Sequence, residues 1–420
     1  MSRTISRVGG TVTLSASYVY DAAGRVTRVD YGNGTRLVRV YDNADRVMQI
    51  QYVDAGSNAY IKMDYTLTAD GLVKRIVETD LVSNGQVDYG TGVGQGGVTP
   101  GPIVAQVDFT YDARNRLTRE TRTVTGAFDS DLGPSEYDLS YTYDVGGNRL
   151  TKTDGLTGRV TTYVYDIETD NAIDNNQQNN RLLGYDVTDT AGGEPVAVEQ
   201  AHYKYGPAGN VMFLVKQLDM DGDGTIDQND LAAVWWFYYD AGNHLWLAVQ
   251  GTANFDEPTG TLSGVAYDKA AEYRYDGGRQ RYLVRQRDPN ANFAILGTGQ
   301  WRDYIGNSVY NDYTVDATTG TVTNGKAYIP GIGYDDPSMT DSPAYYGSDL
   351  IGTARRVSDS SAGVSPVIHR TVLTAFGEPV NSAGTGNRFR KKFAGLLFRS
   401  VVTLRCFSII SRRTQKSYQR

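Results

Sequence analysis

The sequence contains little cysteine, histidine or proline: one, three and 12 residues, respectively, in a chain of 420. The single cysteine, Cys406, excludes a disulfide bond within the chain and a zinc site built from several cysteines. His202, His244 and His369 lie far apart in the sequence, which disfavours a metal site with several histidine ligands. No run approaches about 20 apolar residues, and the first residues lack the apolar segment of a signal peptide. We therefore expect neither a membrane span nor a signal peptide in this sequence.

Positive charge is also scarce before residue 387. Ten of the 41 Lys and Arg residues lie in residues 387–420, where there is no acid. The preceding residues therefore carry 31 basic against 48 acidic side chains, a net charge of −17. Because nucleic-acid binding relies on positive charge that neutralises phosphates, we expect no nucleic-acid partner.

Glycine and tyrosine, by contrast, are abundant, at 47 and 31 residues. This composition disfavours helical bundles and doubly wound α/β enzymes, and it favours many short strands and turns. The tyrosines recur in a unit that reads Tyr-Asp-x-x-Gly/Asn-Arg-Val/Leu, so the chain is a repeat protein. Copies begin at Tyr20, Tyr41, Tyr111 and Tyr143, the last read with one extra residue before Arg149, and weaker copies begin at Tyr165, Tyr205, Tyr239 and Tyr275.

The unit has the chemistry of a β-hairpin. An aromatic residue usually stands two positions before the tyrosine, which places both rings on one face of a strand. The Asp accepts backbone hydrogen bonds and starts a turn of four or five residues, and the Gly or Asn tolerates positive φ. Residues 84–102, rich in Gly, and 170–180, rich in Asn and Gln, are predicted to be loops that interrupt the pattern.

A single hairpin is marginally stable, so the hairpins must stack to bury their aromatic faces. The predicted fold is all-β: stacked antiparallel β-hairpins that form a curved or spiral β-shell. The recurring Tyr and Asp are then hairpin builders. In the alternative interpretation, tyrosines on the outer face bind glycans by stacking.

With these units, the sequence resembles the YD-repeat, or Rhs-repeat, family. Residues 345–359 are similar to the segment that opens the family's core region, and residues 373–380 are similar to its Tyr-Asp-Pro-Phe-Gly-Glu element. Residues 387–389 and 393–395 fit the steps that follow. The resemblance implies a hollow β-shell that encloses a C-terminal toxin or effector domain, and a protein that is secreted or lies at the cell surface.

The sequence departs from the family after Gly395. The Gly-Leu-Tyr-Tyr and Asp-Pro-x-x-Gly-Arg stretches that follow the core in relatives, and the aspartyl site at which several of them cleave themselves, do not occur here. We therefore expect a truncated or frameshifted member with no toxin domain. Its predicted parts are a YD-repeat β-sheet region (1–325), an incomplete core segment (326–395) and an aberrant basic tail (396–420).

One stretch, residues 219–230, matches the spacing of a twelve-residue calcium loop. It supplies oxygen ligands at loop positions 1, 3, 5, 9 and 12, a backbone carbonyl at position 7, and a glycine at position 6, where the chain must turn sharply. Position 12 is Asp rather than Glu, as in dockerin-like loops. The sequence therefore predicts a structural Ca²⁺ held by Asp219, Asp221, Asp223, Thr225, Asp227 and Asp230.

The sequence offers few signs of catalysis. It contains no Gly-x-Ser-x-Gly elbow, phosphate-binding glycine loop, His-Glu-x-x-His or Cys-x-x-Cys motif. The Asp335-Asp336-Pro337 stretch is predicted to be a turn, His369 to lie on a strand, and Cys406 has no identifiable base. We therefore expect no enzyme and no catalytic residues.

Three functional hypotheses follow. The first is a structural scaffold, a partial β-shell of the kind that encapsulates or presents a toxin or effector domain, with that domain or another shell component as partner. The second is an extracellular, calcium-dependent carbohydrate-binding or adhesion module. The third, an autoprocessing core, is disfavoured because the aspartyl motif does not occur in this sequence.

Overall fold

The protein folds as one antiparallel β-sheet. The computed structural model describes residues 2–7, 10–55, 59–80, 103–125, 135–166, 180–227, 229–257, 260–338, 343–350, 354–358 and 367–384. Its regular elements there are 27 strands, and each strand pairs antiparallel with the next one along the chain. The predicted all-β class, built from stacked hairpins, is confirmed.

The first half of the sheet contains the strands β1 (Ser2–Arg7), β2 (Gly10–Tyr20), β3 (Val26–Tyr31), β4 (Arg36–Tyr41), β5 (Val47–Val53), β6 (Ala59–Leu67), β7 (Val73–Asp80), β8 (Ile103–Tyr111), β9 (Leu117–Thr125), β10 (Tyr137–Tyr143), β11 (Arg149–Asp154), β12 (Arg159–Tyr165) and β13 (Leu182–Asp189). The second half contains β14 (Val196–Tyr205), β15 (Val211–Leu218), β16 (Ala232–Tyr239), β17 (Leu245–Asp256), β18 (Thr261–Tyr275), β19 (Arg281–Asp288), β20 (Ala294–Ile305), β21 (Ser308–Asp316), β22 (Val322–Ile329), β23 (Gly333–Asp335), β24 (Ala344–Ser348), β25 (Ala354–Ser358), β26 (Val367–Leu373) and β27 (Pro379–Gly384).

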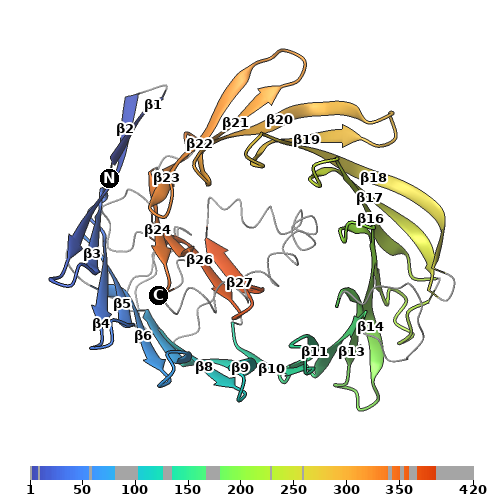
Figure 1. Cartoon of the computed structure of the whole chain (residues 1–420), viewed down its shortest axis with the longest axis horizontal. Helices are drawn as coiled ribbons and strands as arrows, with labels where there is room; N and C mark the ends of the chain where they lie inside the picture. The colour runs from blue at the N-terminus through green and yellow to red at the C-terminus, as the bar shows by residue number, and fades with distance from the viewer. Residues whose placement is uncertain are drawn as a thin grey trace, which may run out of the picture.

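The sheet curls into a spiral. Strands β2 to β22 curve around a central space, and β24, β26 and β27 lie within this ring (Figure 1). The return is marked by β23, which contacts β2, and by the ring of Tyr345, whose centroid lies 5.4 Å from that of Tyr31. The C-terminal strands of the curved sheet thus lie within the ring that the preceding strands form. The predicted curved or spiral shell is confirmed.

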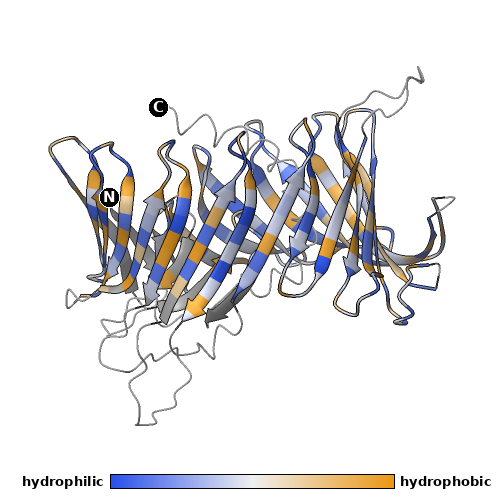
Figure 2. Cartoon of the chain, turned by 90° about the horizontal axis from the view of Figure 1, so that it is seen from below, coloured by the Kyte–Doolittle hydropathy of each residue, from blue (hydrophilic) through white to orange (hydrophobic). Residues whose placement is uncertain are grey.

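The aromatic stripe of the repeat faces the inside of the spiral. In β10, the side chains of Tyr137, Leu139 and Tyr141 are buried, and the residues between them are half-buried. Hydrophobic and hydrophilic positions alternate along the strands between the two rims of turns (Figure 2). This alternation has the period of two that a strand imposes, so one face of each hairpin builds the inner wall.

Where the repeat carries its aspartate, that side chain closes the turn, as its chemistry predicts. In the unit at Tyr111, the Asp112 carboxylate accepts hydrogen bonds from the backbone N–H groups of Arg114 and Arg116, both at 2.9 Å, and from the Arg116 Nε at 2.7 Å. The Arg116 N–H and side chain thereby hold the pKa of Asp112 below its usual value, although partial desolvation opposes this. The fifth residue, Asn115, has a φ of 60°, the left-handed conformation for which the unit carries Gly or Asn.

At six turns, the tyrosine that leads into the turn joins its hairpin to the one before it. Its hydroxyl donates a hydrogen bond to the backbone carbonyl of the residue that starts a strand of the preceding hairpin. This contact recurs from Tyr41 to Val26, Tyr111 to Val73, Tyr143 to Leu117, Tyr205 to Leu182, Tyr239 to Val211 and Tyr304 to Arg281, at 2.7–2.9 Å. The tyrosine is therefore a lateral tie between hairpins.

The arginine of the repeat completes this ladder. The Arg25 guanidinium lies 4.7 Å from the ring centroid of Tyr41, in the next unit, and donates to the Asp45 carboxylate of that unit's turn. Likewise, Arg116 lies 4.9 Å from the Tyr143 ring and donates to the Asp144 carbonyl. Cation–π contact and hydrogen bonding thus connect successive turns along one rim.

The unit at Tyr143 differs from the alignment predicted from the sequence. Tyr143 pairs with Arg149, just as Tyr111 pairs with Leu117, so there is no extra residue. Asn148 occupies the position of the arginine, and its backbone N–H and side-chain amide both donate to Asp144. Assigning Arg149 to that position was wrong, because the shorter amide of Asn fills the same hydrogen-bonding role.

Two further copies of the turn escaped detection because threonine replaces the aspartate. The Thr68 hydroxyl accepts the Leu72 N–H at 3.0 Å, and the Thr374 hydroxyl accepts the Glu378 N–H at 3.1 Å. Gly71 and Gly377 take the left-handed position in these turns. The segment 373–380 is therefore another hairpin turn of the same kind.

Several predictions concern residues outside the described ranges. They are most of the loops predicted at 84–102 and 170–180, the core steps at 387–389 and 393–395, and the tail 396–420. The division predicted between residues 325 and 326 falls inside β22. It stays a prediction, as do the three parts themselves.

Candidate functional site: the inner wall and the acidic loop

The C-terminal strands pack against the inner wall of β9 to β11. The ring of Phe376, in the turn between β26 and β27, meets that of Tyr141 edge-on, with centroids 5.0 Å apart. Beside it, the Ala375 N–H donates to the Glu120 carboxylate at 2.8 Å. An apolar contact and a charge-assisted hydrogen bond therefore seat this turn against the wall.

Ion pairs continue the contact. The Glu378 carboxylate pairs with the Lys152 ammonium and lies 4.0 Å from a terminal nitrogen of Arg149. The Arg149 guanidinium in turn covers the rings of Phe376 and Tyr163, at 5.0 and 4.5 Å from their centroids. Arg149, which does not belong to the turn at Tyr143, is thus a residue of the inner wall that contacts the C-terminal turn.

Glu120 is the most buried acid of this contact, with 0% exposure. Its second oxygen accepts the Tyr141 hydroxyl at 2.7 Å. Burial raises the pKa of Glu120, which outweighs the opposing effect of the hydrogen bonds from Tyr141 and Ala375. Burial and the neighbouring Glu120 carboxylate also raise the pKa of the Tyr141 hydroxyl. No sequence pattern marks this cluster, because Glu120 stands in an ordinary strand pattern.

The N-terminal strands also contact the C-terminal part of the chain, at residues 345–348. The Tyr31 hydroxyl donates to the Tyr346 carbonyl at 3.3 Å, and the Tyr52 hydroxyl donates to the Ser348 carbonyl. Gly32 leaves room for this approach, since a Cβ there would lie 2.6 Å from the Tyr345 hydroxyl. The stretches 345–350 and 373–380, which resemble the family's core, are therefore the parts that lie inside the spiral.

The acidic loop lies between β15 and β16. A carboxylate oxygen from each of Asp219, Asp221 and Asp223 falls within 4.8 Å of the other two. Gly224, at position 6, has a φ of +83°, so the sharp turn expected there is present. The Asp219 carboxylate also accepts the N–H groups of Gly222 and Gly224, at 2.7 and 3.1 Å, which wraps the loop around it.

The other three predicted ligands are placed differently. Asp230 is 1% exposed, and its carboxylate accepts the N–H groups of Met220 at 2.7 Å and Asp227 at 3.1 Å. Asp227 binds the Asn229 N–H, and Thr225 donates to Asp223 through its N–H and hydroxyl, which lowers the pKa of Asp223. Three carboxylates within reach of one cation fit a hard metal such as Ca²⁺, whereas Asp227 and Asp230 lie outside that group.

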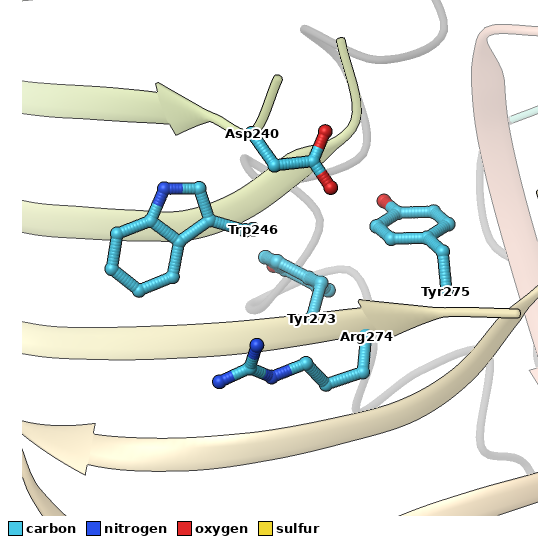
Figure 3. A pocket seen from close by; sticks show the side chains of 5 residues that line it. All are labelled: Asp240, Trp246, Tyr273, Arg274 and Tyr275. Atoms are coloured by element: carbon cyan, nitrogen blue, oxygen red, sulfur yellow. The ribbon is translucent and has the colours of Figure 1, made fainter. Parts of the chain in front are cut away.

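A pocket of about 390 Å³ opens beside β17 and β18, lined by Asp240, Trp246, Tyr273, Arg274 and Tyr275. Asp240 and Tyr275 face each other in it, and Trp246 lies beside Tyr273 (Figure 3). The sequence assigned Asp240 and Tyr275 to turns, and no spacing marks Trp246 or Arg274. The pocket was therefore missed because it forms between residues of two successive hairpins.

The remaining singled-out residues have structural roles where they are described. Asp336 accepts the Ser338 N–H at 3.0 Å and pairs with Lys326 at 3.1 Å, so the predicted turn is confirmed. Serine and lysine contacts lower the pKa of Asp336 against the effect of burial. His369 lies on β26, as predicted, whereas Cys406 lies outside the described residues.

These observations define a class of protein: an all-β chain whose single antiparallel sheet curls into a spiral shell of repeated hairpins. No helix in the described part of the chain is long and apolar enough to cross a membrane. No family model matches the chain, and no curated protein matches it.

Solved structures similar to this one include two TcdB2-TccC3 chains. The chain named TcdB2-TccC3-TEV is 13% identical over 88% of this chain and 24% of its own length, with a TM-score of 0.24. TcdB2-TccC3 without its hypervariable C-terminal region is 14% identical over 90% of this chain and 25% of its own length, with a TM-score of 0.23. This chain thus spans about a quarter of their length.

A third similar structure is a porin-like protein from Bacteroides uniformis, 10% identical over 57% of this chain and 94% of its own length, with a TM-score of 0.25. The resemblance to YD-repeat proteins rests on the repeated sequence unit and the core-like segments, rather than on these likenesses.

Proposed function

We propose that the chain is a non-enzymatic structural scaffold, a partial β-shell whose inner wall holds polypeptide. The observation that carries this proposal is the seating of Ala375, Phe376 and Glu378 against Glu120, Tyr141 and Lys152. The wall there combines aromatic rings with paired charges, the composition of a surface that binds protein. A toxin or effector domain, or another shell component, is the partner we propose.

A fusion tests the scaffold. A protease-sensitive reporter peptide is attached after residue 420 of the full chain, and its cleavage rate is compared with that of the free reporter. We expect slower cleavage in the fusion, because a shell that holds polypeptide on its inner wall would shield the attached reporter. Cleavage at the rate of the free reporter would contradict the proposal.

We further propose that the acidic loop binds a structural Ca²⁺, mainly through Asp219, Asp221 and Asp223. Without a cation, three carboxylates within 4.8 Å of one another repel. A loop with Asp at its last position suits the millimolar Ca²⁺ outside cells, which favours a secreted or cell-surface location. Calorimetry should show Ca²⁺ binding that Asp223→Ala removes and that the control Asp45→Ala, in a turn of the repeat, retains. Absence of binding by the unaltered chain would contradict the proposed site.

The calcium-dependent carbohydrate-binding alternative has weaker support. The repeat tyrosines mostly point to the inner face and are half-buried, and only a few aromatic rings, such as Tyr20 and Tyr267 at 56% and 47%, are well exposed among the described residues. Screening of the chain on a glycan array checks this alternative, and specific binding would favour it over a purely structural scaffold.

A further inference from the structure

Two arginines on neighbouring strands lack an acidic partner. Arg281 begins β19 and Arg302 lies on β20, and neither forms an ion pair within the described part of the chain. The Arg281 Nε is shielded from solvent and has no hydrogen-bond partner there. Burial lowers the pKa of Arg281, and the positive charge of Arg302 lowers it further, so the two guanidinium groups repel each other.

Both arginines belong to the inner wall. The Arg281 guanidinium lies 5.3 Å from the ring centroid of Tyr273, whose ring packs in one cluster with Tyr185. The Tyr185 ring contacts that of Tyr163 at 6.2 Å, and Arg149 covers both Tyr163 and Phe376. Arg281 therefore lies on the face of the sheet that, further along, contacts the C-terminal turn at Arg149. Arg302 lies two residues from Tyr304, whose hydroxyl bonds the Arg281 carbonyl.

The acids near this pair are engaged elsewhere. Asp312 lies opposite Arg302 in the strand register, but its carboxylate accepts the Lys326 N–H at 2.5 Å and the Tyr328 hydroxyl at 2.9 Å. Asp240, in the adjoining pocket, accepts the His244 N–H at 2.9 Å. Among the described residues, the wall thus presents two guanidinium groups without an acidic partner, and the shielded Arg281 Nε lacks the hydrogen bond that a buried polar atom needs.

We propose that Arg281 and Arg302 form an oxyanion-binding site on the inner wall, which takes the carboxylates of a polypeptide held inside the shell. Guanidinium groups bind planar carboxylates with paired, charge-assisted hydrogen bonds. The pocket of about 390 Å³ is lined by Tyr273, whose ring Arg281 contacts, so it gives room beside Arg281 for the rest of the bound segment. The choice of a polypeptide rests on the proposed scaffold function, whereas the oxyanion chemistry does not, since free phosphate would satisfy the same two groups.

Calorimetry on the full chain tests the site with three probes: octaglutamate, octaglutamine and inorganic phosphate. We expect octaglutamate to bind, octaglutamine not to bind, and Arg302→Gln to weaken octaglutamate binding by about tenfold or more. Arg159→Gln, which changes an exposed arginine on β12, is the matched control and should leave binding unchanged.

A second readout separates a binding role from a structural one. Without probe, Arg302→Gln should melt at a higher temperature than the unaltered chain, because it removes the repulsion at Arg281. A lower melting temperature would indicate a structural arginine and overturn the proposal. Binding of phosphate alone would overturn the polypeptide source, and binding of neither anion would overturn the site. If the fusion reporter is protected but no anion binds, the proposed scaffold function is retained and the proposed oxyanion site is refuted.

Discussion

A single hydroxyl group decides how neighbouring hairpins are tied together. The Tyr143 hydroxyl donates to the Leu117 carbonyl at 2.7 Å, whereas Tyr20, which belongs to the first repeat unit and is 56% exposed, makes no such contact within the described ranges. We therefore expect Tyr143→Phe to lower the free energy of unfolding by about 1 kcal/mol. Tyr20→Phe should leave it unchanged. Urea unfolding of both variants measures this, and equal effects would refute the lateral tie.

The buried Glu120 makes the inner contact depend on pH. Its pKa is raised in the folded chain above the ordinary value of 4.5, so the folded state takes up a proton more readily than the unfolded state. The stability that this proton adds is fully present below the unfolded pKa and is lost as pH rises through the folded pKa. The unaltered chain should therefore gain stability relative to Glu120→Gln as the pH is lowered from neutral toward the unfolded value of 4.5. Unfolding of both chains at each pH checks the sign, and a relative loss would refute it.

At the scale of one element, the turn shows why the hairpins were predictable. Asp112, Asn115 and Arg116 lie within five residues, so their local spacing is enough to predict the turn and its hydrogen bonds. Asp219, Asp221 and Asp223 likewise lie within five residues, and their carboxylates come within 4.8 Å of one another, whereas Asp227 and Asp230 of the same predicted loop lie outside that group. A different side chain can make the same hydrogen bond. Asn148 does so and led to a wrong alignment of its unit, and Thr374 does so in a turn that the sequence pattern did not identify.

The left-handed position of the turn gives a paired prediction. Gly24 has a φ of 79° and Arg279 a φ of 63° at equivalent positions, and a Cβ at Gly24 would meet no atom within 4 Å. Only backbone strain therefore matters there. Gly24→Val should destabilise the fold by about 1–2 kcal/mol, and Arg279→Gly should stabilise it by up to about 1 kcal/mol. Thermal unfolding tests the pair, and shifts of the same sign would contradict the assigned turn geometry.

At the scale of the whole molecule, the sequence predicted a curved or a spiral shell and did not decide between the two. The contacts that close it join residues far apart in the sequence, such as Tyr31 with Tyr345 and Glu120 with Ala375, and they follow no spacing rule. The inner arginines and the pocket beside Trp246 escaped notice for the same reason. Local turn chemistry specified each hairpin, whereas the accumulated curvature of many hairpins placed the C-terminal strands inside the first ones.

Hydrogen exchange at the Ala375 amide tests the central claim, that the C-terminal strands lie against the inner wall. Ala375 is itself exposed, but its N–H donates to buried Glu120, so we expect slow exchange in the full chain. Glu120→Ala should speed this exchange toward that of an unstructured peptide, while the Arg116 amide, bonded to Asp112, stays protected. Exchange of the Ala375 amide at the unstructured rate in the unaltered chain would show that the strands do not lie inside, and would contradict the account.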